Sequence, residues 1–185
     1  FYDFKKHGVH NAFYLPMAAP VDCYDSIKKE DMDGERYGAD ISFVGSTYNE
    51  ERQDFFQYIN GVNKYTAGYL QGIMKMQGEV YGEFILEGLL TDNILHELQR
   101  VCPIRKGEDE WETEAWIYAN YFLARKLTGE QRVEQLELLG KKHFVKLYTS
   151  ERKLEIPNVI NCGPVDYMEE MPRVFKNSKI NLNMT

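Results

Sequence analysis

Two short turns contain the residue types whose spacing could bind a ligand. They are Gly45, Ser46 and Thr47 after the apolar segment 40–44, and Gly163, Pro164 and Val165 after the segment 159–162. A glycine between a strand and a helix lets backbone N–H groups approach an anion at the helix N-terminus. Each turn alone is explained more simply as an ordinary turn, because glycine ends many strands. Two such turns in one predicted sheet favour a ligand site more than either does singly.

No familiar catalytic or nucleotide-binding motif accompanies these turns. The sequence lacks G-x-G-x-x-G, G-x-x-x-x-G-K-[ST], G-x-S-x-G and H-E-x-x-H. The histidines have no obvious carboxylate partner, and they are His7, His10, His96 and His143. Trp111 and Trp116 could stack on a sugar or a base, but on an amphipathic helix aromatic side chains more often pack in the core. The residues alone therefore predict a binding scaffold and leave the catalytic residues unknown.

Asp31 and Asp33 have the D-x-D spacing of some metal-dependent sugar-nucleotide enzymes. Paired carboxylates could hold a divalent ion that bridges a diphosphate. Such a motif should close an apolar strand, whereas Lys28, Lys29 and Glu30 precede this one. We therefore interpret the pair as part of a solvated linker and expect no metal, with a metal-dependent enzyme as the weaker alternative.

Composition excludes several classes of protein. The chain has 185 residues with 22 Lys and Arg against 29 Asp and Glu, which gives a net charge of −7. Its 43% hydrophobic and 14% aromatic content is too high for a disordered chain. An acidic balance argues against nucleic acid as a partner, and no apolar run reaches the roughly 20 residues of a membrane span. Cys23, Cys102 and Cys162 are far apart, which favours a reduced, cytoplasmic protein without a metal site.

The order of patterns predicts an α/β fold in which a large helical insertion, residues 60–140, interrupts a parallel sheet. Compact apolar segments predict strands at 40–46, 143–149, 159–162 and 179–183, and a helix-compatible run covers 49–59. Helices are expected over 65–90, 91–100, 110–126 and 168–177, and a capping box at Thr128 and Gln131 predicts another that ends near Gly140. One face of the first should carry Tyr65, Tyr69, Ile73, Met76, Val80 and Phe84. Short strands separated by helices favour right-handed parallel crossovers.

The domain organisation is predicted from composition. Residues 22–39 are polar and linker-like, so residues 1–21 are expected to be the tail of a preceding domain and residues 40–185 a partial Rossmann-like domain. The chain begins without an initiator Met and stops directly after a strand pattern. We therefore expect a central piece of a longer protein.

Several stretches occur in the order and spacing of one family. They are residues 13–19, 40–48, 69–74, 144–149, 161–165, 170–175 and 178–185. Together they resemble the spore-maturation (CgeB-like) glycosyltransferases of bacteria, in which a domain of unknown function precedes a group-1 glycosyltransferase domain. The resemblance runs from about Asn11 to Thr185 and rests on the order of the stretches, because no single motif is specific.

The resemblance implies a GT-B architecture, of which this chain would hold an incomplete C-terminal domain. Gly45 and Ser46 would lie near the diphosphate of a sugar-nucleotide donor. The nucleotide pocket would be edged by Tyr148, Thr149, Gly163, Pro164 and Val165, and the donor would also lie near Asn183 and Thr185. No metal cofactor is implied, and the acceptor is unknown. Later donor-contacting segments of the family are missing here, so the piece by itself is expected to be inactive.

A non-catalytic interaction module is the alternative from a different class. In that case the aromatic helical block would bind a protein partner, and the glycine turns would be ordinary turns. The enzyme hypothesis predicts an open crevice at the carboxyl ends of the first three strands. The module hypothesis predicts a filled crevice and an exposed apolar patch on the helices.

Overall fold

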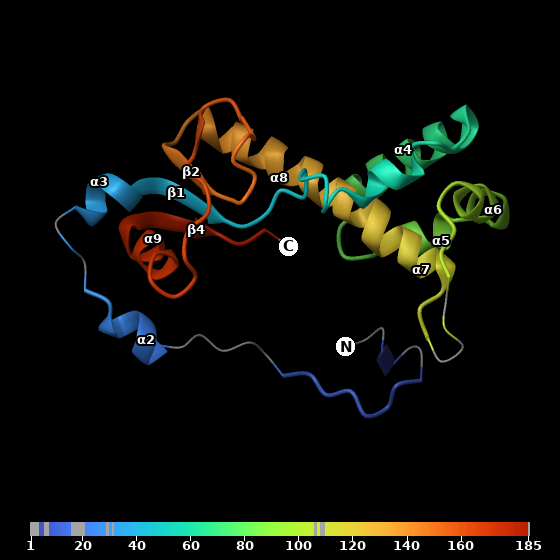
Figure 1. Ribbon diagram of the computed structural model, residues 1–185, viewed down its shortest axis with the longest axis horizontal. Coiled ribbons are helices and arrows are strands. Elements are labelled where there is room, and N and C mark those ends of the chain that lie inside the picture. Colours follow the sequence, from blue (N-terminus) through green and yellow to red (C-terminus); the bar gives the residue numbers. More distant parts are fainter. Residues whose placement is uncertain are drawn as a thin grey trace.

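A four-stranded parallel sheet forms one end of the molecule, and a block of helices forms the other (Figure 1). The computed structural model describes residues 4–5, 8–15, 21–28, 30, 32–105, 107 and 110–184. The strands are β1 (Ala39–Val44), β2 (Val145–Tyr148), β3 (Val159–Asn161) and β4 (Ser178–Leu182). Their order across the sheet is β3-β2-β1-β4, and Ile41 pairs with Val145 on one side and with Ile180 on the other. The predicted α/β fold with a parallel Rossmann-like sheet is confirmed.

Alternating side chains give the sheet two buried faces. Ile41, Phe43, Val145 and Leu147 pack against Leu136 of helix α8 (Arg125–Gly140). The opposite face carries Tyr148, which packs with Tyr37 of α3 (Asp33–Tyr37) and Val174 of α9 (Met171–Asn177). The sheet is thus the middle layer of three. A ligand site built on the strands would therefore lie at the edge where the strands end.

Residues 21–37 contribute two short helices before the sheet begins. The first is α2 (Val21–Ser26), and α3 follows within the segment predicted to be a linker. Tyr37 and Asp33 of α3 are buried, because Tyr37 packs under the sheet and Asp33 pairs with Arg173 of α9 at 3.0 Å. The second half of this segment is therefore packed against the sheet domain.

The helical block has its own apolar core. Its elements are the 3-10 helix η1 (Phe55–Ile59), α4 (Lys64–Glu79), α5 (Leu86–Leu89), α6 (Asp92–Val101), α7 (Glu114–Ile117) and the π-helical segment η2 (Tyr118–Ala124). The core is centred on the fully buried Leu70, Leu86, Leu98, Tyr118 and Leu123. Residues 49–54 are turn and irregular backbone, so the predicted helix over 49–59 is wrong except for its last turn.

The predicted apolar face of α4 is confirmed at Tyr69 and Ile73, which pack in the core, and wrong at Tyr65 and Met76. The helix ends at Glu79, and its buried residues are Thr66, Leu70, Ile73 and Met74. Tyr65 and Met76, which were expected on the buried face, are 74% and 49% exposed. The buried face of the helix begins at Thr66 on the first turn, and the aromatic ring of Tyr65 lies at the surface.

One continuous helical run from Glu114 to Gly140 replaces the two helices expected there. It passes from α7 through η2 into α8 without a break, so Thr128 lies inside α8 and caps nothing. A Cβ atom at Gly129 would lie 2.5 Å from the Thr47 carbonyl oxygen. Glycine is therefore present at position 129 because the helix lies directly on the loop that follows β1, and the capping-box prediction is wrong.

Candidate functional site at the carboxyl edge of the sheet

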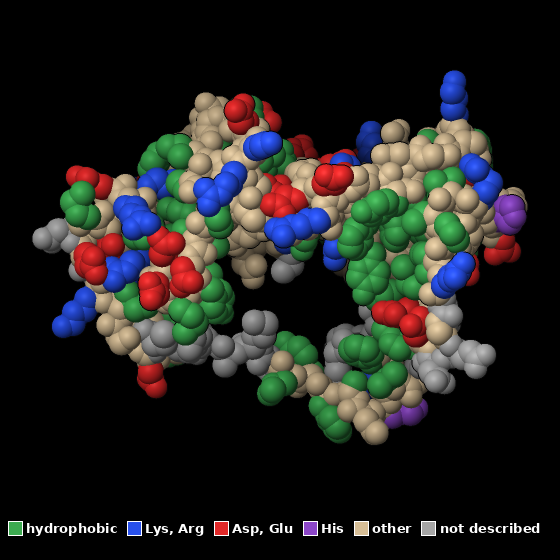
Figure 2. All heavy atoms as spheres, in the orientation of Figure 1, with side chains coloured by type: hydrophobic (Ala, Val, Ile, Leu, Met, Phe, Trp, Pro, Cys, Tyr) green, Lys and Arg blue, Asp and Glu red, His purple; other side chains and the backbone are tan. Residues whose placement is uncertain are grey.

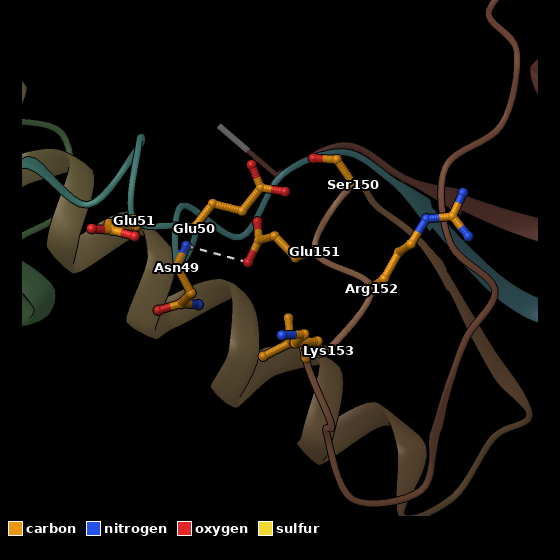
Figure 3. Close-up of a pocket in the computed structure, with 8 residues that line it drawn as sticks. Asn49, Glu50, Glu51, Ser150, Glu151, Arg152 and Lys153 are labelled. Carbon is orange, nitrogen blue, oxygen red and sulfur yellow. Dashed lines mark hydrogen bonds between the residues drawn. The ribbon is translucent and has the colours of Figure 1, made fainter.

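The loops that follow β1 and β2 enclose a cavity of about 620 Å³ (Figure 3). Parallel strands end at one edge, so these two loops meet although about 100 residues separate them in the sequence. The residues that line the cavity are Asn49, Glu50, Glu51, Ser150, Glu151, Arg152, Lys153 and Leu154. A cavity therefore opens at the edge where the glycine turns predicted a site. Its walls are residues 49–51, just beyond the first of those turns, and residues 150–154 of the loop after β2.

Gly45 has a structural role at the end of β1. Its N–H donates to the Tyr148 carbonyl at 3.0 Å, which extends the pairing of β1 with β2. A Cβ atom at this position would lie 3.0 Å from the ring of Phe43. The glycine thus makes room for a core side chain, and its N–H group is already used within the sheet.

The carboxylate of Glu151 is held by the loop after β1. Its Oε1 atom accepts from the Thr47 N–H at 2.6 Å and from the Ser46 hydroxyl at 2.9 Å. Its Oε2 atom accepts from the Thr47 hydroxyl and from the Asn49 N–H at 3.3 Å. Glu151 is only 6% exposed. Ser46 and Thr47, two of the residues predicted to bind the donor, therefore bind an anion here, and that anion belongs to the chain.

The backbone around Glu151 is fixed by neighbouring polar groups. The Asn161 side chain, at the end of β3, donates to the Glu151 carbonyl and to the Leu154 carbonyl, both at 2.9 Å. The buried Thr149 hydroxyl accepts from the Glu151 N–H at 3.3 Å. Thr149, another predicted site residue, thus shapes the β2 loop. These bonds aim the Glu151 side chain at the β1 loop.

Arg132 of α8 bridges the carboxyl ends of β1 and β4. One terminal nitrogen donates to the Ser46 carbonyl at 2.6 Å, and the other donates to the Met184 carbonyl, next to the predicted site residue Asn183. The Nε atom of Arg132 is buried without a hydrogen-bond partner. Strand order reverses between β1 and β4, which is where doubly wound sheets bind nucleotides. A guanidinium group therefore lies at the topological switch point.

Tyr48 lies between two guanidinium groups of the same helix. Arg125 and Arg132 stand 5.3 Å and 4.8 Å from the centre of its ring, a cation–π distance. Tyr48 has a φ of 59°, in the left-handed region that residues other than glycine rarely adopt. Within the described part of the chain, neither arginine forms an ion pair with a carboxylate. This edge of the sheet therefore carries two guanidinium groups that form no ion pair with the described side chains.

The other charged residues at the cavity include both cations and anions. Arg52 donates to Glu50 at 2.6 Å, and this bond, before all other causes, lowers the pKa of Glu50, which stays ionised at neutral pH. Arg152 and Lys153 are exposed. In Figure 3, Arg152 points away from Glu50 and Glu151. A ligand entering the cavity would meet both signs of charge.

The loop after β3 lies beside Arg152. Gly163 has a φ of 78°, and its N–H donates to the Asn161 side chain at 3.0 Å. Its α-carbon faces the Arg152 guanidinium, which would be 3.6 Å from an added Cβ atom. Pro164 is exposed, whereas Val165 packs against the cluster under α3 and α9. This loop borders the β2 loop, and its residues do not line the cavity.

Tyr148 faces away from the cavity. It is 3% exposed and packs with Tyr37 and Val174 on the opposite face of the sheet. Burial raises the pKa of its hydroxyl well above the ordinary value, so the group stays protonated. Thr185 and Asp31 lie outside the described residues. Asp33 is bonded to Arg173, and nowhere in the described ranges do three His, Cys, Asp or Glu side chains gather as a metal ion would require.

The predicted glycine turns lie at this edge of the sheet, whereas Glu151, Arg132 and Arg125 were not among the predicted site residues. Glu151 closes the loop after β2, and its position three residues beyond the strand was a usable signal, since loops at one sheet edge meet. Arg125 and Arg132 are seven residues apart, which places them on one face of a helix. The sequence prediction placed the two arginines on separate helices, so it could not place them on one face.

Comparison with family models, with curated proteins and with solved structures finds no match to this chain. In the described segments no helix has the length and apolar character needed to cross a membrane.

Proposed function

We propose that this chain supplies the donor side of a glycosyltransferase, which binds a nucleoside-diphosphate sugar at the carboxyl edge of the sheet and transfers the sugar to an acceptor. The observation that carries the proposal is the all-parallel β3-β2-β1-β4 order with the cation Arg132 at its switch point. The resemblance to spore-maturation glycosyltransferases supports the same function. The cavity of about 620 Å³ is within the usual range for small-molecule sites.

The residues of the edge suit a diphosphate without a metal. Arg132 and Arg125 offer fixed positive charge beside the β1 loop, and Arg152 and Lys153 offer further charge at the mouth of the cavity. Preorganised donors of this kind stabilise the negative charge that develops on the departing diphosphate. Glu50 and Glu51 can accept hydrogen bonds from the hydroxyl groups of a ribose or a sugar.

Calorimetric titration of the 185-residue chain with UDP, GDP, ADP and dTDP tests this proposal. Saturable binding of one nucleotide is expected, with a loss of about tenfold in affinity when Arg152 and Lys153 are both changed to Ala. The matched control changes the exposed Lys64 and Lys75 of α4 to Ala and should leave binding unchanged. Absence of binding by the folded chain, or an equal loss in the control, would overturn the proposal.

A protein-interaction module is the second candidate function, and one observation favours it. An apolar depression of about 390 Å³ on the helical block is lined by Phe55, Tyr58, Ile104, Ile117, Tyr121 and Phe122. Figure 2 shows hydrophobic side chains gathered over the helices on the right. Arg125 borders it, 4.8 Å from the ring centre of Phe55. The variant Tyr58→Arg should abolish partner binding if this function holds, and should leave nucleotide titration unchanged.

A further inference from the structure

We propose that residues 46–49 form a phosphate-binding loop, and that the Glu151 carboxylate occupies this loop as an internal anion that an incoming phosphate group must displace. The inference rests on the proposed function, because it names the part of the donor that the β1 loop would bind. It also identifies Glu151 as the group that controls entry.

The donors of the loop are those a phosphate group needs. The Thr47 and Asn49 N–H groups and the Thr47 hydroxyl point at the two oxygens of one carboxylate. The Ser46 hydroxyl lies within hydrogen-bonding distance of the same carboxylate and of the Gln53 side-chain oxygen. The left-handed backbone at Tyr48 lies between the two N–H groups and lets both face the same side. The intervening Tyr48 N–H donates to the Ser46 hydroxyl at 2.8 Å. N–H groups that flank a left-handed residue in this way form an anion-binding nest, as in many phosphate sites. The nest binds an anion in this structure without any help from a helix N-terminus.

The absence of an ion pair distinguishes Glu151 from a carboxylate with a purely structural role. Among the described residues, no Lys, Arg or His forms an ion pair with it. Burial of a carboxylate is costly unless it is paired or fully hydrogen-bonded, and here the hydrogen bonds to the carboxylate come from uncharged N–H and hydroxyl groups. A phosphate group carries more acceptor oxygens and more charge, so it can use the same dipoles and also the nearby guanidinium groups of Arg125 and Arg132.

The cavity gives the displaced carboxylate a place to go. Glu151 lines it, and so does Lys153 two residues further along the same loop (Figure 3). Since Asn161 fixes the backbone carbonyl of Glu151, rotation of the side chain alone can move the carboxylate out of the nest. In the cavity it would be solvated and could pair with the exposed ammonium group of Lys153. The site therefore has two arrangements, one closed by Glu151 and one open to phosphate.

Removal of the internal anion tests the proposal. The variant Glu151→Ala should bind inorganic phosphate and pyrophosphate about tenfold more tightly than the wild-type chain, because the nest is no longer occupied. Its unfolding temperature should be lower than that of the wild type in buffer, and added phosphate should restore it. The matched control is Glu155→Ala, an exposed glutamate of the same loop, which should change neither quantity. Calorimetry and thermal unfolding measure both.

A second variant guards against a loss of folding. Glu151→Gln keeps the size of the side chain and removes its charge, so it should also bind phosphate more tightly than the wild type. If a folded Glu151 variant binds phosphate no more tightly than the wild type, the proposal is overturned. Tighter binding of phosphate but not of pyrophosphate or nucleotide would identify free phosphate as the ligand. In that case the loop stands as a phosphate site and the glycosyltransferase function fails separately.

Discussion

Glu151 and Glu170 are two carboxylates of the sheet domain that are held in opposite ways. Glu170, beside α3 and α9, accepts from the Arg36 guanidinium at 2.5 Å, the Tyr37 hydroxyl at 3.0 Å and the Asp166 N–H at 3.0 Å. Glu151, at the carboxyl edge, accepts only from neutral donors. One carboxylate is therefore matched by a cation of its own, and the other leaves two nearby guanidinium groups without an ion-pair partner.

The surroundings of the two carboxylates extend this contrast. Beside Glu170, Arg173 pairs with Asp33 at 3.0 Å and with Glu30 at 2.7 Å, so charges there are neutralised locally. Beside Glu151, Arg132 donates to backbone carbonyls and retains a buried Nε atom without a partner. Buried polar atoms without a hydrogen-bond partner occur on both sides, namely the Tyr148 hydroxyl on the α3 and α9 side and the Arg132 Nε atom at the carboxyl edge. The two sides therefore differ in their ion pairs: the α3 and α9 side pairs its arginines with carboxylates, whereas Arg132 at the carboxyl edge is not paired with one of the described carboxylates.

The largest expected effect breaks the Glu151 side alone. Gly129→Ala places a Cβ atom 2.5 Å from the Thr47 carbonyl oxygen, which forces α8 away from the loop that holds Glu151. We expect the free energy of unfolding to fall by about 3 kcal/mol, as in overpacked cores. Denaturant unfolding measures it. The matched control Gly68→Ala lies in α4 with open space around it and should raise stability by up to about 1 kcal/mol. Equal stability of the two variants would contradict the packing argument.

The next effect tests the bridge across the switch point. Arg132→Met keeps most of the length of the side chain but removes its bonds to Ser46 and Met184, so stability should fall by about 2 kcal/mol. Nucleotide affinity should fall as well if the proposed function holds. Arg105→Met, at an exposed position, should be neutral in both measurements. An Arg132 variant as stable as the wild type would show that these two hydrogen bonds do not contribute to stability.

A smaller effect is expected on the Glu170 side. Tyr37→Phe keeps the buried ring and removes the hydroxyl that donates to Glu170, at a cost of about 1 kcal/mol. Equilibrium unfolding in urea is the measurement, with Tyr58→Phe on the helical surface as the control, because Tyr58 is 54% exposed. Phosphate affinity should be unchanged. A change in phosphate affinity would contradict the claim that the regions around Glu151 and Glu170 are independent.

The smallest effect concerns pH. The Asp166 N–H, followed by the Tyr37 hydroxyl and the Arg36 guanidinium, lowers the pKa of Glu170. Its contribution is therefore present above the unfolded pKa of about 4.3 and is lost as pH falls through the lower folded value. Glu170→Gln should flatten the decline in the free energy of unfolding, measured by urea titration below about pH 4.3. The difference should be less than about 1 kcal/mol because Arg36 is exposed. An unchanged slope would show that Glu170 is not the group responsible.

Local patterns were enough to predict the sheet but not the contacts across it. Segments such as 40–44 and 145–148 are short, apolar and bounded by turn residues, so their strand character is encoded locally. The contact of Glu151 with Thr47 joins residues 104 positions apart, and no periodicity carries that information. The helix boundary at Thr128 failed for the same reason, since the capping signal was overridden by the packing of Gly129 on the β1 loop.

The unbroken helix from Glu114 to Gly140 also has a mechanical consequence. At about 1.5 Å per residue it is a rod of about 40 Å, with one end in the aromatic core of the helical block and the other behind the sheet (Figure 1). Arg125 and Arg132 are fixed to this rod about 10 Å apart. A tilt of the helical block would therefore move both guanidinium groups together relative to the β1 loop. The distance between these cations and an anion bound at the loop would thus depend on the orientation of the helical block.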